Sequence, residues 1–140
     1  MTVFILVPGM FTGPHVWDET AARLVAAGAE AHAVTLRGGD LEAHIADVLA
    51  VIDSVNGSEI VLVGHDYGIH PAVGAADRRA DRIARIVHLD AGIPQDGVPA
   101  LAAVPDQSLR ARVAEQADGP LAPPANRDEW GRWGSTTGVA

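Results

Sequence analysis

Short apolar runs alternate with stretches of helical periodicity along the first two thirds of the chain. The apolar runs, which predict buried strands, cover residues 3–7, 33–36, 60–63 and 83–89. The stretches that predict helices cover residues 17–27, 40–55 and 67–79. This alternation predicts an α/β protein: a parallel sheet with helices on both faces. We expect the first strand to lie centrally, between the second and the third, with the fourth outermost.

The third apolar run leads into a turn flanked by glycines, Gly64-His65-Asp66-Tyr67-Gly68. This turn matches the nucleophile-elbow pattern G-x-S-x-G, except that Asp66 stands where the pattern has serine. A chain that passes from strand to helix at one residue has strained backbone there, and the glycines let neighbouring backbone approach. The pattern therefore predicts Asp66 at the tip of the turn, at the helix end that favours negative charge.

The replacement of serine by aspartate alters the chemistry that the turn supports. A serine hydroxyl needs a base to remove its proton, whereas an aspartate carboxylate is a nucleophile at neutral pH without that help. The alternative interpretation is that Asp66 is only the N-cap of the next helix, because aspartate is among the preferred N-caps. Both interpretations stay open on the sequence.

Four motifs occur in a fixed order: Val7-Pro8-Gly9-Met10 with Trp17 beyond it, Val34-Thr35-Leu36-Arg37-Gly38, residues 61–68, and Ile86-Val87-His88-Leu89-Asp90-Ala91. In this order they resemble the N-terminal half of small α/β-hydrolase-fold proteins of the esterase and hydroxynitrile-lyase-like group. The resemblance implies that Asp66 takes the nucleophile position. It also implies that the backbone N–H groups of Met10 and Tyr67 form the oxyanion hole.

The sequence departs from the family pattern at three positions. Pro8 stands where histidine is usual, and Ile69 stands where a further glycine is common. Pro71 is expected to kink the helix after the turn, because proline has no N–H to donate.

The chain has 140 residues, which suits one domain. We expect residues 1–94 to form the N-terminal part of the hydrolase core, truncated after the fourth strand. Residues 95–140 are expected to begin a helical cap or a C-terminal extension. Because the family needs at least six strands, the open edge of the fourth strand predicts a homodimer or a second polypeptide that completes the sheet.

Six histidines occur, but none has the position of the family base, which follows the last strand. His15 is the remaining candidate, because the loop after the first strand overlooks the elbow in this fold. His65 is expected to pack away from the nucleophile, and His88 to be a core histidine. Without a base, an ester on Asp66 is expected to accumulate after one turnover.

Four other residues are candidates for the site. Asp90 ends the fourth strand, at the sheet edge where α/β proteins place their sites, and some dehalogenase-like relatives take a catalytic acid from there. The alternative for Asp90 is a turn residue before Ala91 and Gly92. Phe11, Trp130 and Trp133 are candidate substrate-binding residues, with packing as the alternative for the two tryptophans.

Composition excludes several classes of partner. Ten basic and eighteen acidic residues give a net charge of −8, which argues against nucleic acid and anionic membranes. The absence of cysteine and of nucleotide-binding fingerprints predicts neither a metal nor a cofactor. The apolar run at residues 3–7 is too short for a signal peptide or a membrane span, so a cytoplasmic protein is expected.

An aspartate nucleophile favours particular substrates. Attack on an ester gives a reactive mixed anhydride, whereas attack on a saturated carbon bearing an epoxide or a halide gives an ordinary ester. We therefore expect a hydrolase for a small organic substrate, epoxide hydrolase-like or, less well matched, dehalogenase-like. Two alternatives stay open: a cofactor-free lyase or cyclase with Asp66 as base, and a binding module without catalysis.

Overall fold

A computed structural model describes residues 1–10, 12–37, 39–103 and 105–116. The strands are β1 (Thr2–Val7), β2 (Glu30–Ala33), β3 (Glu59–His65) and β4 (Ile83–Leu89). The α-helices are α1 (Asp18–Ala26), α2 (Leu41–Ser54), α3 (Ile69–Arg78) and α4 (Gln107–Gln116). Three 3-10 helices connect them: η1 (Pro14–Trp17), η2 (Asp66–Gly68) and η3 (Ala100–Ala103).

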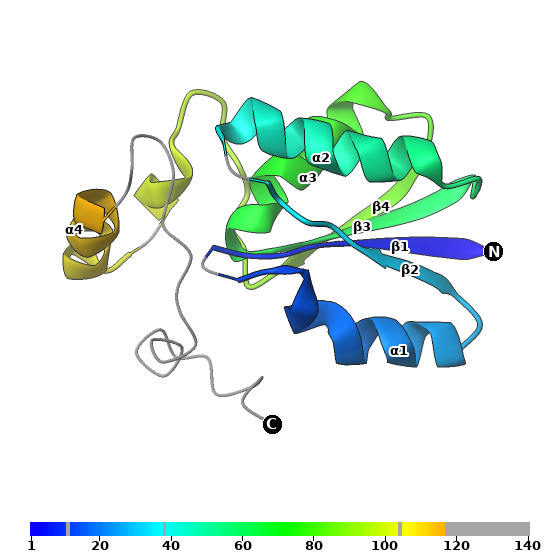
Figure 1. Cartoon of the computed structure of the whole chain (residues 1–140). Helices are drawn as coiled ribbons and strands as arrows, with labels where there is room; N and C mark the ends of the chain where they lie inside the picture. The colour runs from blue at the N-terminus through cyan, green and yellow to red at the C-terminus, as the bar shows by residue number, and fades with distance from the viewer. Residues whose placement is uncertain (11, 38, 104, 117–140) are drawn as a thin grey trace.

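The four strands form one parallel sheet in the order β2-β1-β3-β4 (Figure 1). The central strand β1 is paired on both sides, with Ile5 opposite His32 of β2 and Leu62 of β3. The predicted parallel sheet and the predicted strand order are both confirmed. Because all four strands run the same way, the segments that follow them meet at one edge of the sheet.

Helices cover both faces of the sheet, as the sequence predicts. Figure 1 shows α2 and α3 on one face and α1 on the other. On the face of α1, a smaller apolar cluster contains Leu6, Trp17, Val61 and Val63.

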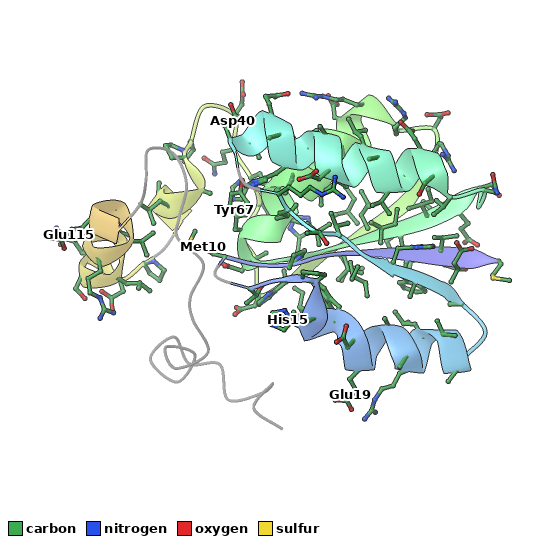
Figure 2. The ribbon with its side chains drawn as sticks, viewed as in Figure 1. Met10, His15, Glu19, Asp40, Tyr67 and Glu115 are labelled. Carbon is green, nitrogen blue, oxygen red and sulfur yellow. The ribbon has the colours of Figure 1, made fainter. Side chains whose placement is uncertain are left out.

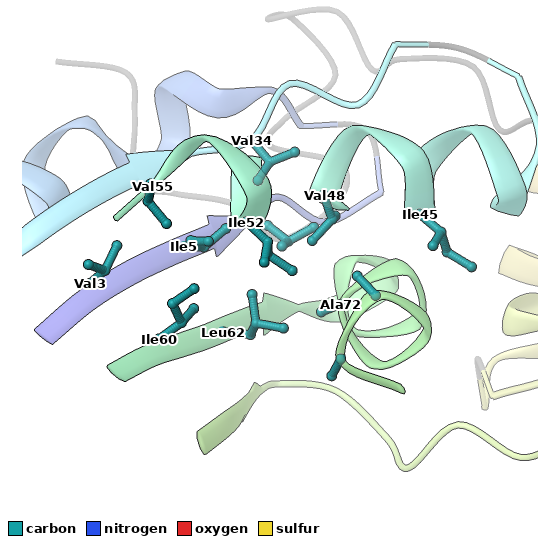
Figure 3. Close-up of a cluster of buried hydrophobic side chains, with 13 residues drawn as sticks. Val3, Ile5, Val34, Ile45, Val48, Ile52, Val55, Ile60, Leu62 and Ala72 are labelled. Atoms are coloured by element: carbon teal, nitrogen blue, oxygen red, sulfur yellow. The ribbon is translucent and has the colours of Figure 1, made fainter. Parts of the chain in front are cut away.

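A larger apolar cluster lies between the sheet and the pair α2 and α3 (Figure 3). Ile45, Val48 and Ile52 recur at helical spacing, so they share the face of α2 that packs on β1 and β3. The sheet contributes Ile5 and Leu62, which are completely buried. Burial of each such side chain stabilises the folded state by about 1.5–3 kcal/mol. This cluster therefore holds in place the strands whose ends carry the segments at the sheet edge.

The second strand lies earlier in the sequence than predicted. It covers Glu30–Ala33, whereas the apolar run at residues 33–36 predicted it later. As an outer strand of the described sheet, β2 is only half buried and tolerates polar residues such as His32. Val34 and Leu36 are apolar because they pack on the larger core cluster.

Pro71 does not interrupt the helix after the elbow, contrary to the expectation of a kink. The first turn after Asp66 is the 3-10 helix η2, so α3 begins at Ile69 and Pro71 lies in its first turn. The first N–H groups of a helix have no intrahelical acceptor, so proline loses little there.

The segment after β4 leads to α4, which lies beyond the carboxyl edge of the sheet in Figure 1. Asp106 caps this helix by accepting hydrogen bonds from the N–H groups of Ser108 and Leu109, at 2.8 and 3.0 Å. None of the described helices is both long enough and apolar enough to cross a membrane.

Candidate active site

The elbow turn joins β3 to α3 with a sharp change of direction at Asp66. Its φ of 50° lies in the left-handed region, which few residues other than glycine adopt. Glycine is required at both flanking positions because a side chain there would not fit. A Cβ on Gly64 would lie 2.5 Å from Cα of Ile69, and a Cβ on Gly68 would lie 2.5 Å from the carbonyl oxygen of Pro8. The sequence therefore folds here as the elbow pattern predicts.

The carboxylate of Asp66 reaches the segment after β1. Its Oδ2 accepts a hydrogen bond from the backbone N–H of Met10 at 3.0 Å. Gly9 permits this approach, since a Cβ there would lie 2.7 Å from Nδ1 of His65 and 3.0 Å from Cβ of Asp66. Neither η2 nor α3 has a side-chain cap hydrogen bond, so Asp66 does not serve as an N-cap.

Tyr67 lies between two histidines. Its hydroxyl is 2.8 Å from Nδ1 of His44 on α2, and the two rings meet edge to face. On its other side the ring of His70 is stacked, with centroids 5.8 Å apart and planes 27° apart. The structure thus links α2 to the first turn of α3 through three aromatic rings.

Burial sets the protonation of these three rings. Burial raises the pKa of Tyr67 to about 12, and the negative charge of Asp40 adds to this effect. Burial lowers the pKa of His44, against the opposing charges of Asp47 and Asp40. It also lowers the pKa of His70, against the opposing charge of Asp66. Neutral imidazole rings therefore predominate at both histidines at neutral pH.

His70 also lines a pocket of about 230 Å³ beside the elbow helix. Its other walls come from the segment after β4. Gln95 is the second polar residue of the lining, and the apolar residues are Ile93, Pro94, Val98, Pro99 and Ala102. The lining is mostly apolar, but the volume lies below the roughly 300–1,000 Å³ of typical small-molecule sites, and Asp66 is not part of the lining.

The structure places the candidate base His15 in η1, where it is exposed. In Figure 2, His15 lies on the α1 side of the sheet, whereas Tyr67 lies on the α2 side. The role of His15 as base stays a prediction. His65 is half-buried and contacts Trp17 edge to face, with centroids 6.3 Å apart, so it packs as expected.

Asp90 is exposed directly after β4, with a φ of 45°. This left-handed geometry is typical of a turn residue, and the proposed role as catalytic acid stays a prediction. His88 is not the core histidine that the sequence predicts. It is exposed and its Nδ1 lies 3.0 Å from the carbonyl oxygen of Gly92, because β4 is an outer strand whose side chains are only partly covered.

Three predicted substrate-binding residues, Phe11, Trp130 and Trp133, lie outside the described residues. Within the described part of the chain, no group of three or more His, Cys, Asp or Glu side chains is placed to hold a metal ion. The described candidates for chemistry at the sheet edge are therefore a carboxylate, a phenol and imidazoles.

Comparison with known proteins agrees with this geometry. The model of a family described as "Alpha/beta hydrolase family" matches residues 4–138. The chain belongs to the alpha/beta hydrolase family. A carbendazim hydrolyzing esterase from Nocardioides sp. (strain SG-4G) is 36% identical to this hydrolase-family chain over 127 residues, which cover 83% of the chain and 52% of the esterase.

Two solved structures have a similar arrangement of their chains. An extracellular alpha/beta-hydrolase from a Paenibacillus species superposes with a TM-score of 0.75 at 26% identity, over 82% of this chain and 52% of its own. Tomato methylketone synthase I superposes with a TM-score of 0.70 at 21% identity, over 94% of this chain and 59% of its own, which supports the fold alone. The chain spans about half the length of the relatives that it matches.

Sequence reasoning did not identify His44 and His70 as neighbours of the elbow of this alpha/beta hydrolase. A local signal existed for His70, which follows Asp66 by four residues and so lies about one helical turn on. No local signal existed for His44, because its contact with Tyr67 depends on how α2 packs against α3.

Proposed function

We propose that this chain provides the nucleophile of a hydrolase for small organic substrates, and that Asp66 attacks a saturated carbon of an epoxide or, as second choice, an alkyl halide. The observation that supports this proposal is the Asp66 carboxylate at the strained tip of the elbow, with Oδ2 held by the N–H of Met10 at 3.0 Å. In this proposal residues 95–140 begin a cap over the site.

The hydrogen bond from Met10 gives the two carboxylate oxygens of Asp66 different roles in this proposal. Oδ2 is held, so Oδ1 is the oxygen that attacks carbon. The product of that attack is an ester whose carbonyl oxygen is Oδ2. When water later adds to this ester, negative charge develops on Oδ2, where the N–H of Met10 already points. The N–H of Tyr67, in the first turn after Asp66, is the second proposed donor.

Epoxides and halides differ in their need for a proton. Ring opening of an epoxide leaves an alkoxide that must be protonated, whereas a halide leaves as a stable anion. Tyr67 is the only tyrosine of the chain, and its pKa of about 12 keeps the phenol protonated at neutral pH. A phenol of this pKa can protonate an alkoxide, which is far more basic, where the alkoxide replaces the present partner of the hydroxyl, Nδ1 of His44.

The named activity of the Nocardioides relative, hydrolysis of carbendazim by an esterase, supports a small organic substrate for this chain as well. Ester hydrolysis itself fits Asp66 less well. Carboxylate attack on an ester carbonyl gives a mixed anhydride, while attack on a saturated carbon gives a stable ester that water can cleave.

Two alternatives stand beside this proposal. Asp66 can act as a base that only removes a proton, as in a lyase or cyclase, through Oδ1 while the N–H of Met10 holds Oδ2. The other alternative is a binding module without catalysis.

Mass spectrometry of the trapped intermediate tests the proposal. The protein is mixed with styrene oxide, and separately with an alkyl bromide, in heavy-oxygen water under single-turnover conditions. We expect an alkyl ester on the peptide that contains Asp66, followed by heavy oxygen in that carboxylate and none from water in the first product.

The matched variant is Asp66→Asn, because asparagine also accepts a positive φ but lacks the nucleophilic oxygen. We expect this variant to form no ester and to lose at least about a thousandfold in turnover. Turnover that persists in Asp66→Asn would rule out the proposal. Turnover lost without any ester in the wild type would instead favour Asp66 as a base.

A further inference from the structure

We propose that His44 is a positioning residue of the elbow: its hydrogen bond to the hydroxyl of Tyr67 fixes Tyr67, and with it the aim of the neighbouring Asp66. This inference rests on the proposed function, because it names a residue that prepares Asp66 for attack. His44 acts through Tyr67 and takes no part itself in making or breaking bonds.

The first support is that a polar side chain occupies a buried position of α2. His44 is 8% exposed and belongs to the buried residues of this helix together with Ile45, Val48 and Ile52. Burial of an imidazole costs free energy unless the ring finds a hydrogen-bond partner, so an apolar residue would serve packing better at this position. The partner of the His44 ring is the hydroxyl of Tyr67, 2.8 Å from Nδ1, which supports a role for this contact beyond packing.

The second support is that Tyr67 is held from two helices. Its hydroxyl is bonded to His44, and the rings of these two residues meet edge to face, with centroids 5.6 Å apart. The ring of His70, on α3, is stacked on Tyr67 with centroids 5.8 Å apart. The side chain of Tyr67 cannot turn without losing the hydrogen bond and both ring contacts, so the backbone that carries it is restrained as well.

The third support is the place at which these contacts act. Tyr67 follows Asp66 directly, so an anchor on its side chain restrains the backbone beside the strained residue, whose φ is 50°. The N–H of Met10, in the segment after β1, holds the carboxylate of Asp66. His44 holds the next residue from α2. A strained turn persists only where the surrounding structure fixes it, and these two hydrogen bonds fix the elbow from two different elements.

The aim of the elbow matters for attack by a carboxylate. A displacement of about 1 Å at a reacting group can cost about a hundredfold in rate, because the reacting atoms leave the geometry that precedes attack. Loss of the contact with His44 should therefore slow the formation of an ester on Asp66. The backbone N–H of Tyr67, the proposed second donor, would be displaced in the same way.

Single-turnover mass spectrometry with an alkyl bromide tests the inference, because bromide leaves without a proton and the result does not depend on Tyr67 as an acid. We expect His44→Leu to form the ester about tenfold more slowly than wild type. His44→Asn should restore most of the rate, since asparagine offers a donor and an acceptor near the position of Nδ1. Tyr67→Phe should match His44→Leu, and the double variant should be no slower than either. His32→Asn, on the outer strand β2, is the control and should behave as wild type.

Nuclear magnetic resonance gives a second readout that needs no substrate. Tyr67 is the only tyrosine of the chain, so labelling with heavy-nitrogen tyrosine gives one amide signal, from the elbow itself. Protonated His44 can only donate to the hydroxyl, so this signal should shift as pH falls below 6.5, through a pKa that burial lowers against the charges of Asp40 and Asp47. The pKa of His70, on the other side of Tyr67, is lowered as well. The shift that belongs to His44 is therefore the part that His44→Asn removes and His70→Asn keeps.

Three outcomes would overturn the inference. Ester formation at the wild-type rate in His44→Leu would show that the contact does not aim Asp66. Equal slowing in His44→Leu and His44→Asn would assign the effect to the loss of a buried ring instead of a hydrogen bond. An amide signal of Tyr67 with the same pH dependence in wild type and His44→Asn would show that the charge on His44 does not reach the elbow. Absence of the ester from wild type would overturn the proposed function instead, and the amide signal would still decide whether His44 holds the elbow.

Discussion

Asp66 combines a strained backbone with a side chain fixed at one oxygen. A φ of 50° costs an ordinary residue about 1–2 kcal/mol, although aspartate and asparagine accept it more readily than most. The strain aims the carboxylate at the N–H of Met10 instead of along its own helix. Strained residues that the surrounding fold holds in place are concentrated at functional sites, and the packing at Gly64 and Gly68 holds this one.

The buried histidines make stability depend on pH. The pKa of His44 is lowered in the folded protein, mainly by burial, from the value of 6.5 that applies to the unfolded chain. Between these two values the unfolded state binds more protons, so the free energy of unfolding falls as pH falls. The stability that the folded protein has with His44 neutral is fully present above pH 6.5, and it is lost as pH falls through the lowered pKa of His44 in the folded protein. The lowered pKa of His70 acts in the same direction.

We therefore expect the urea midpoint to be lower at about pH 5.5 than at about pH 7.5. His44→Gln removes one titrating group and should flatten this dependence, whatever its effect on stability at neutral pH. The carboxyls with lowered pKa, Asp53 and Asp106, titrate below their usual 3.8, outside this window. A midpoint that stays constant or rises toward pH 5.5 would contradict the argument.

The elbow is an element in which close backbone contact replaces side-chain packing. Gly68 has a φ of −57°, which any residue adopts, so its glycine is needed for space alone. An added Cβ would lie 2.5 Å from the oxygen of Pro8 and 2.6 Å from that of Val7. Both oxygens belong to backbone at the end of the central strand, where Val7 pairs with Gly64 of β3.

Gly68→Ala should therefore lower the free energy of unfolding by about 1–3 kcal/mol or more. Gly92→Ala is the matched control, because a Cβ there would meet no described heavy atom within 4 Å, and it should stay within about 0.5 kcal/mol of wild type. Urea unfolding of the three proteins measures both values. Equal stability of the two variants would show that the backbone at Pro8 yields without cost.

Elements with a strong local pattern were predicted well, and contacts between elements were not. β4 has the predicted bounds, Ile83–Leu89. The helix predicted over residues 40–55 is α2, and Asp40 caps it by accepting a hydrogen bond from the N–H of Ala43. The predicted position of β2 was wrong because the residues of an outer strand need not be apolar. The contact of His44 with Tyr67 joins residues far apart in sequence, and periodicity carries no information about such a contact.

At the scale of the whole molecule, the two faces of the sheet are covered but β4 forms one end of the described sheet. The first part of this edge is protected. The register skips Ala84, with Ile60 opposite Ile83 and Val61 opposite Arg85, and such a bulge with an adjacent charge discourages pairing. The second part has no such protection, and Leu89 is 45% exposed there.

We expect the unprotected half of β4 to pair with a second copy of the chain, or with another polypeptide that extends the sheet. Light scattering at micromolar concentration should give a mass above that of the monomer if the partner is a second copy. Leu89→Lys places a charge on the edge and should weaken self-association at least about tenfold, equivalent to 1.4 kcal/mol. Val25→Lys, at an apolar position of α1 that is 56% exposed, is the control and should leave the mass unchanged. A stable monomer for the wild type would rule out self-association, and equal effects of the two lysines would place the contact elsewhere than on β4.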